Sequence, residues 1–198
     1  AKLAEKNGAT VIVDELYSRQ IFDNHPYTHL RAQNIVNPDN LITIIGPSKT
    51  ESLSGFRLGV AFGSPKLITR MEKLQAIVSL RCAGYNQSVF ATWFHEPEGF
   101  MKERVAAHQV IRDDLLGLFN SAAGITVRPT EGGSYIFPRV EGLKVDIKDF
   151  TKILRMQAAV TVTPGTEFGP QFTDCFRLNF SQDAKKAHDA IVRTLQII

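Results

Sequence analysis

Residues 46–59, GPSKTESLSGFRLG, directly follow the apolar run Leu41–Ile45 (LITII) and say most about the fold of this chain. Small residues flank Lys49, and Arg57 lies eight positions further on. Glycines and serines allow close backbone approach to a ligand, and a guanidinium fork fits a phosphate through two hydrogen bonds. The stretch therefore indicates an anion-binding turn at the end of a strand, although a solvated polar turn has a similar composition. A P-loop is excluded, because its glycine, lysine and serine order is absent.

The surrounding residues predict an α/β layer. Thr10–Val13 (TVIV) is short and β-branched, as is typical of a parallel strand buried on both faces, and Asp14 follows at once. Arg57–Phe62 indicates a third short strand, and Pro65 suits the first turn of a helix. The apolar positions of that helix recur at helical spacing: Leu67, Ile68, Met71, Leu74 and Val78. Polar groups are thus expected to gather at the strand ends.

The second half has a different pattern. Residues 86–120 are helical in pattern, with interruptions expected at Pro97 and Gly99, and residues 121–124 end the pattern. Strands are then expected at 126–128, 134–137, 160–162 and 176–180, with helices near 146–157 and 183–197. We therefore expect an α/β part at 1–85, a connecting helix at 86–120 and a small α+β domain at 121–198.

Composition excludes several classes of protein. The 198 residues are 43% hydrophobic with a net charge of +3, which suggests neither a nucleic-acid nor a membrane-surface partner. Cys82 and Cys175 lack metal or disulfide spacing, and the five histidines share no ligand pattern, so no metal is implied. No membrane helix or signal peptide is recognisable, and a soluble cytoplasmic protein is expected. Residues 1–8 resemble the end of a helix closed by glycine, which suggests that the chain starts within a fold.

Four motifs together resemble the ordered signature of the class I and II aminotransferases, which use pyridoxal 5′-phosphate on fold type I. They are Asp14-Glu15-Leu16-Tyr17, Ser48-Lys49, Arg57-Leu58-Gly59 and Phe176-Arg177-Leu178-Asn179-Phe180. Their spacing agrees across essentially the whole chain, as does the loop of Pro164-Gly165 and Phe168-Gly169. The resemblance implies the carboxyl-terminal half of such an enzyme: part of the large-domain sheet, the long helix and the small domain.

The resemblance also implies a role for each motif residue. Lys49 would form the Schiff base with the cofactor and then move the substrate's α proton. A buried Asp14 would keep the pyridine nitrogen protonated, and Tyr17 would place its hydroxyl near the ring oxygen. Ser48 and Arg57 would bind the phosphate. Arg177 would hold the substrate's α-carboxylate through two hydrogen bonds.

Arg81 and Asn86 match the spacing of an arginine and an asparagine in relatives that act on dicarboxylic acids. That match implies a homodimer in which Arg81 reaches the neighbouring subunit's site and favours aspartate or glutamate. A solvated loop arginine is the alternative. The family often has serine or threonine where this chain has Gly46, so one phosphate hydroxyl is expected to be missing.

Three functions stay open on the sequence alone. An aminotransferase would exchange an amino group between an amino acid and a 2-oxo acid. A pyridoxal-phosphate lyase or synthase of the same fold could use the same Asp14, Lys49 and Arg57. A non-catalytic fragment would lack the family's amino-terminal half, including the aromatic residue that stacks on the cofactor ring, and would bind the cofactor weakly or not at all.

Overall fold

The computed structural model describes residues 1–198, which form two compact units, Ala1–Met101 and Lys102–Ile198. The boundary falls in the first turn of helix α4 (Phe100–Ser121). The division at residues 85 and 120 therefore stays a prediction. None of the helices combines the length and the apolar character needed to cross a membrane.

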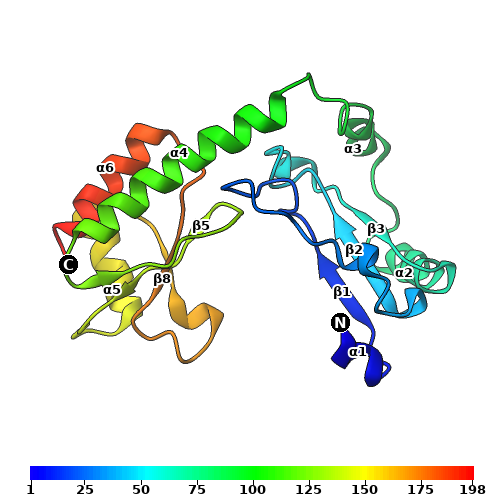
Figure 1. Cartoon of the computed structure of the whole chain (residues 1–198), viewed down its shortest axis with the longest axis horizontal. Helices are drawn as coiled ribbons and strands as arrows, with labels where there is room; N and C mark the ends of the chain where they lie inside the picture. The colour runs from blue at the N-terminus through cyan, green and yellow to red at the C-terminus, as the bar shows by residue number, and fades with distance from the viewer. The chain divides into compact units, whose positions relative to one another are not determined.

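The first unit is built on a three-stranded sheet in the order β1 (Val11–Asp14), β2 (Leu41–Ile45) and β3 (Val60–Phe62) (Figure 1). β1 and β2 are parallel, with Asp14 opposite Ile44, and β3 runs antiparallel to β2. The helices of this unit are α1 (Lys2–Lys6), α2 (Pro65–Val78) and α3 (Gly84–Gln87), with 3-10 turns at Leu30–Gln33, Pro38–Asn40, Ser54–Phe56 and Ser88–Ala91.

Two expectations for this sheet need correction. β1 is an edge strand, and Ile12 on it is 63% exposed, so it is not buried on both faces. The third strand begins at Val60 and not at Arg57, because Arg57 adopts a left-handed conformation (φ 51°) that ends the preceding 3-10 turn. The strand at 41–45 and the helix that begins at Pro65 are confirmed.

The second unit surrounds short antiparallel strands with helices. β5 (Tyr135–Ile136), β8 (Phe176–Asn179) and β7 (Thr163–Pro164) form one sheet, and β4 (Ile125–Thr126) pairs with β6 (Arg139–Val140). Helix α5 (Ile147–Ile153) continues into a π-helical turn (Leu154–Ala158), a 3-10 turn covers Gly165–Phe168, and α6 (Ala184–Leu195) closes the chain. The β4 strand lies one residue earlier than predicted, and the strand predicted at 160–162 lies instead at Thr163–Pro164.

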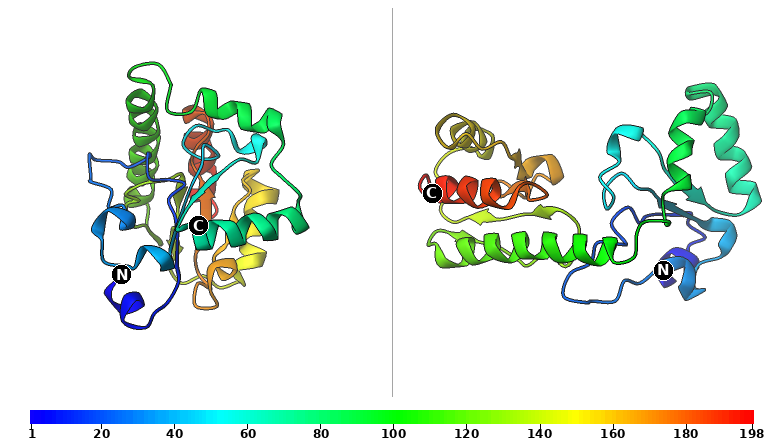
Figure 2. Two further views of the ribbon diagram at one scale, coloured as in Figure 1. Left: turned by 90° about the vertical axis from the view of Figure 1, so that its right-hand side faces the viewer. Right: turned by 90° about the horizontal axis from the view of Figure 1, so that it is seen from above.

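Helices α5 and α6 begin where the sequence places capping residues. Asp146 and Asp183 each accept a hydrogen bond from a backbone N–H in the first turn of the helix that follows, which satisfies donors that would otherwise lack partners. α4 and α6 run side by side (Figures 1 and 2), and His188 Nδ1 on α6 lies 2.8 Å from Asp114 Oδ2 on α4. The two long helices are thereby fastened to each other.

Candidate active site

Strand direction gathers the first three motifs at one end of the first unit's sheet. β1 and β2 are parallel, so the residues after Asp14 and after Ile45 leave the sheet at the same end of the strands. β3 is antiparallel, so its first residue, Val60, pairs with Ile45 at that same end of the sheet. The segments that carry Asp14 and Tyr17, Ser48 and Lys49, and Arg57 are therefore neighbours, although 43 positions separate the first from the last.

The Lys49 turn is held by its own backbone and by the Arg57 segment. The Leu53 N–H donates to Pro47 O (3.1 Å) and the Ser52 N–H donates to Lys49 O (3.2 Å). The Ser48 hydroxyl donates to Leu58 O at 3.4 Å, which ties this turn to the residue after Arg57. The Lys49 side chain is exposed, as an amine that must reach a cofactor requires.

The close packing around position 46, at the start of this turn, favours glycine there. A Cβ atom at this position would lie 2.9 Å from Leu16 Cδ2 and 3.0 Å from Leu58 O. The Leu16 side chain could turn aside, but the backbone at Leu58 and Gly59, which would lie 3.0 Å and 3.3 Å from the new atom, would have to shift by a few tenths of an ångström. The absence of a hydroxyl here, which the sequence presented as a departure from the family pattern, follows from the close approach of the three segments.

Asp14 lies at the carboxyl end of β1, as predicted, but its side chain is exposed and not buried. The reason is that β1 has no neighbouring strand on its other side within this chain. The Leu16 N–H donates to Asp14 Oδ1 (3.1 Å), which turns the chain toward Tyr17. Nearby, burial first and then the charges of Glu15 and Asp14 raise the pKa of the Tyr27 hydroxyl.

Arg57 has a conformation suited to a ligand-facing arginine. Its left-handed backbone turns the chain sharply between the 3-10 turn and β3, and its Nη1 donates to Ser54 O at 2.8 Å. The side chain is otherwise exposed. Such backbone conformations are uncommon outside glycine and concentrate at functional sites.

Arg177 belongs to the second unit, on β8. Its guanidinium carbon lies 4.2 Å from the centre of the Tyr135 ring and 4.5 Å from that of Phe168. Two aromatic faces hold the planar fork in one orientation, which favours recognition of a carboxylate. The neighbouring loop is equally constrained, because a Cβ atom on Gly165 would lie 2.5 Å from Phe172 O.

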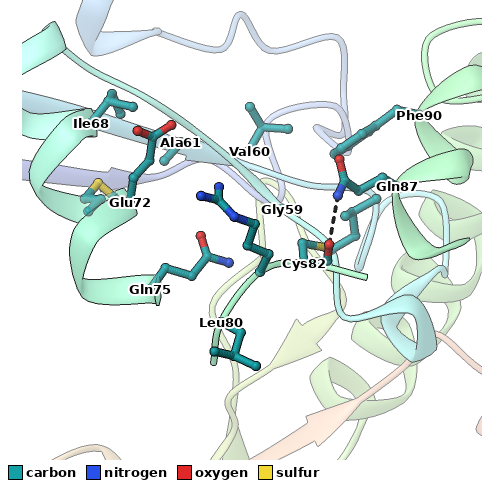
Figure 3. Close-up of a pocket in the computed structure, with 13 residues that line it drawn as sticks. Gly59, Val60, Ala61, Ile68, Glu72, Gln75, Leu80, Cys82, Gln87 and Phe90 are labelled. Atoms are coloured by element: carbon teal, nitrogen blue, oxygen red, sulfur yellow. Dashed lines mark hydrogen bonds between the residues drawn. The ribbon is translucent and has the colours of Figure 1, made fainter. Parts of the chain in front are cut away.

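Arg81 is exposed and lines a cavity of about 390 Å³ within the first unit. Figure 3 shows this cavity between Glu72 and Gln75 of α2 and the segment that contains Cys82 and Gln87, where Gln87 Nε2 donates to Cys82 O at 2.8 Å. The structure thus places Arg81 beside open space that contains one carboxylate.

Sequence reasoning missed a cluster of charged residues behind these turns. Arg19 Nη1 lies 2.6 Å from Glu51 Oε1 and 2.8 Å from Glu96 Oε1. Glu15, only 4% exposed, pairs with His29 at 2.7 Å. The partners are up to 77 positions apart, so no local pattern could reveal them. The one available signal was the location of Arg19 and Glu51, each two residues after a motif residue.

The residues present fit a phosphorylated aldehyde cofactor. An exposed amine (Lys49), a hydroxyl (Ser48) and an exposed guanidinium (Arg57) share one sheet end with a carboxylate (Asp14). The amine complements an aldehyde, the hydroxyl and the guanidinium complement a phosphate, and the carboxylate complements a protonated ring nitrogen. The close packing at Gly46 keeps their turns together.

The fold and the motifs define a transaminase-type chain, and comparison with known proteins agrees. The chain belongs to the aminotransferase class I and II family, whose profile matches residues 1–193. Members of this family use pyridoxal 5′-phosphate, and the architecture is that of fold type I.

Particular relatives are aspartate aminotransferases. That of Musicola paradisiaca (strain Ech703) is 30% identical over 183 residues, which are 91% of this chain and 45% of the relative. That of Pyrococcus horikoshii is 26% identical, over 96% of this chain and 51% of the relative. The crystal structure of an aspartate aminotransferase from Rhodobacter sphaeroides 2.4.1 shares 56% identity with a TM-score of 0.96, and the match covers 100% of this chain and 50% of that one. The chain spans about half the length of the relatives it matches.

Proposed function

We propose that this chain supplies the lysine-bearing part of an aminotransferase that exchanges an amino group between an amino acid and a 2-oxo acid. The observation that carries the proposal is the convergence of the Asp14, Lys49 and Arg57 segments at one end of the sheet. Family membership supports the reaction class, and the aspartate aminotransferases among the relatives support an amino-acid donor.

Each residue has a defined task. Arg57, and the Ser48 hydroxyl once it turns away from Leu58 O, would hold the phosphate of pyridoxal 5′-phosphate. Asp14 would hold the proton on the ring nitrogen, and Tyr17 would supply a hydroxyl to the ring oxygen. When bound, the cofactor supplies a ring that withdraws the negative charge left by the departing α proton. Lys49 Nζ would bind the cofactor and would then accept and return the substrate's α proton. Arg177 orients the α-carboxylate so that one bond of the substrate is broken.

Asp14 provides a direct test of this assignment, in the complete protein that contains this sequence. Asp14→Ala should lower turnover by about a hundredfold to a thousandfold with little loss of folding, because its carboxylate is needed mainly when charge develops on the cofactor ring. Asp39→Ala, a change at an exposed 3-10 turn residue, is the control and should retain turnover.

The same assay separates transfer from elimination. Appearance of the amino group on an added 2-oxo acid supports the proposal, whereas release of ammonia without transfer indicates a lyase. Unfolding of Asp14→Ala with no selective loss of turnover would show that Asp14 is only a turn-forming residue.

We further propose that Arg81 selects a dicarboxylic substrate across a homodimer. Its support is the Arg81 and Asn86 spacing, the exposure of the guanidinium, and the aspartate aminotransferase names of the relatives. Arg81→Leu should lower the preference for aspartate over phenylalanine by about tenfold or more, because a bidentate carboxylate contact is lost. Arg70→Leu, at an exposed α2 position, is the matched control. An unchanged ratio would remove Arg81 from the substrate site.

A further inference from the structure

Arg19 makes an unusually complete set of contacts for a side chain outside the motif residues. Its Nη1 donates to Glu51 Oε1 (2.6 Å) and to Glu96 Oε1 (2.8 Å), and its Nη2 donates to Glu96 Oε2 (3.2 Å). Its guanidinium carbon also lies 4.5 Å from the centre of the Phe94 ring. One planar group is therefore fixed by two carboxylates and an aromatic face.

The partners themselves are anchored. The Thr50 hydroxyl donates to Glu51 Oε2, and Thr50 is 2% exposed. The Phe94 N–H donates to Glu96 Oε1 at 3.2 Å. Arg19, Thr50 and Phe94 also line one cavity of about 200 Å³, so these contacts form a wall of the first unit and not an exposed pair.

The three charged residues of this cluster, Arg19, Glu51 and Glu96, lie on three different segments of the chain. Arg19 lies two residues after Tyr17, Glu51 lies two residues after Lys49, and Glu96 precedes α4. The cluster therefore fastens the turn that carries Lys49 to the turn that carries Tyr17, and both to the segment that leads into the long helix. The backbone hydrogen bonds of the Lys49 turn do not connect it to the Tyr17 turn or to the segment before α4, because they link residues within 47–53.

Charge balance makes Arg19 the essential member. Glu51 and Glu96 are 5% and 16% exposed at their side chains, and Arg19 is the cation that lies between them. The Arg19 hydrogen bond is the main reason that the pKa of Glu96 falls to about 2. Removal of Arg19 would leave two partly buried carboxylates facing each other, which would push the Lys49 turn and residues 93–96 apart.

We propose that Arg19 is a positioning residue for Lys49, acting through Glu51 to hold the lysine turn against the Tyr17 turn. The inference rests on the proposed role of Lys49 in binding the cofactor. Arg19 is assigned no contact with substrate or cofactor, and its contacts in the structure are with Glu51, Glu96 and Phe94. Its effect is on the placement of Lys49 Nζ, where an error of about 1 Å can lower a rate about a hundredfold.

The test uses Arg19→Met and Arg19→Lys in the complete protein loaded with pyridoxal 5′-phosphate. Arg19→Met should lower kcat by about tenfold to a hundredfold while KM for the amino acid changes little, since Arg177 binds the carboxylate. The pH midpoint of the cofactor's visible absorbance should also shift, because that midpoint depends on how Lys49 and Tyr17 lie relative to each other. Arg19→Lys, which keeps the positive charge but loses the planar guanidinium, should have a kcat and an absorbance midpoint that lie between those of Arg19→Met and the unmodified protein.

A second measurement does not depend on the loaded enzyme. Hydrogen exchange of the unloaded protein should become at least about tenfold faster at the amides of Ser52 and Leu53 in Arg19→Met, and stay unchanged in β8 of the second unit. Glu96→Gln, which removes one carboxylate without changing shape, should give a smaller change in the same direction. Arg70→Met, on exposed α2, is the control and should change neither measurement.

The outcomes distinguish the two proposals. If exchange at Ser52 and Leu53 becomes faster but the cofactor is found on another lysine, Arg19 does hold the turn. The role of Lys49, and with it the positioning role of Arg19, would then be wrong. Normal exchange, an unshifted absorbance midpoint and an unchanged kcat in Arg19→Met would overturn the positioning role while leaving Lys49 as the cofactor lysine. If Arg19→Met does not fold, Glu96→Gln and Arg19→Lys decide by the same readouts.

Discussion

The two units of this chain differ in how completely they bury their apolar side chains. Sixteen of the 23 buried hydrophobic residues lie in the second unit, where Leu115, Phe119, Phe176 and Phe180 are 0–1% exposed. In the first unit, α2 has no buried residue, and Ile77 and Val78 are more than 80% exposed. All of the proposed cofactor-binding residues nevertheless belong to the first unit.

Within this chain, the two units are held together in different ways. The second unit has a hydrophobic core of its own, and its Arg177 guanidinium packs against the rings of Tyr135 and Phe168. The first unit aligns polar turns at a sheet end and holds them by close backbone packing at Gly46 and by the Arg19 cluster. For this chain by itself, stability is therefore expected to depend on apolar burial in the second unit and on local contacts in the first.

Loss of a large core side chain is the strongest test of that contrast. Phe176 is 0% exposed and packs near Phe150, so Phe176→Ala should cost about 3–5 kcal/mol of unfolding free energy. Leu74→Ala on α2, at 55% exposure, should change it by less than about 0.5 kcal/mol. Urea unfolding of both variants measures the difference, and equal losses would remove the contrast between the units.

Substitution of Arg177 tests the functional side of the second unit. Arg177→Ala should lower kcat/KM by about a hundredfold, with a higher KM and a lower kcat, because a carboxylate clamp both binds and orients. Steady-state kinetics should show a smaller loss for Arg177→Lys and none for Arg155→Ala, an exposed change in the same unit. Kinetics identical to those of the unmodified protein would exclude Arg177 from substrate binding.

The packing at Gly46 can be tested with a matched glycine. Gly46→Ala should cost about 1–3 kcal/mol and weaken cofactor binding, because its Cβ would press on Leu16 and Leu58. Gly55 has no atom within 4 Å of the equivalent Cβ position, so Gly55→Ala should be tolerated. Thermal unfolding and cofactor titration of the pair are the measurements. Similar behaviour of the two variants would mean that the turns are not closely packed at Gly46.

Acid should loosen the first unit through Glu96. The folded-state pKa of Glu96 is lowered from 4.5 to about 2, so its ion pair contributes fully above about pH 4.5 and is lost as the pH falls through about 2. The effect should be modest, and it should be reduced in Glu96→Gln, whose stability between pH 5 and 2 should fall less steeply. Parallel curves for the two proteins would show that the pair does not stabilise the fold.

Sequence reasoning succeeded where the signal is local and failed where it depends on distant neighbours. The strand at Leu41–Ile45, the Pro65 helix start and the helices near 146–157 and 183–197 follow from short-range patterns and are confirmed. Burial of β1 and of Asp14 is not seen within this chain, where β1 is the edge strand, because burial depends on what packs against such a strand. The family signature located the candidate site residues, whose roles stay predictions.

The Arg19 cluster lay beyond sequence reasoning for the same physical reason. Its partners come from three segments that only the sheet topology brings together, and a charge pattern cannot specify such a pairing. The need for glycine at position 46 was also invisible, since it arises from contacts with residues 30 positions before and 12 after it.

The identity of the lysine that binds the cofactor tests the central claim most directly. Borohydride reduction of the complete protein loaded with pyridoxal 5′-phosphate, followed by peptide mapping, fixes the cofactor to the lysine that holds it. The account predicts a label on Lys49, lost in Lys49→Ala and retained in Lys66→Ala, a change at an exposed lysine of α2. A label on Lys66 or Lys73, or one that survives Lys49→Ala, would contradict it.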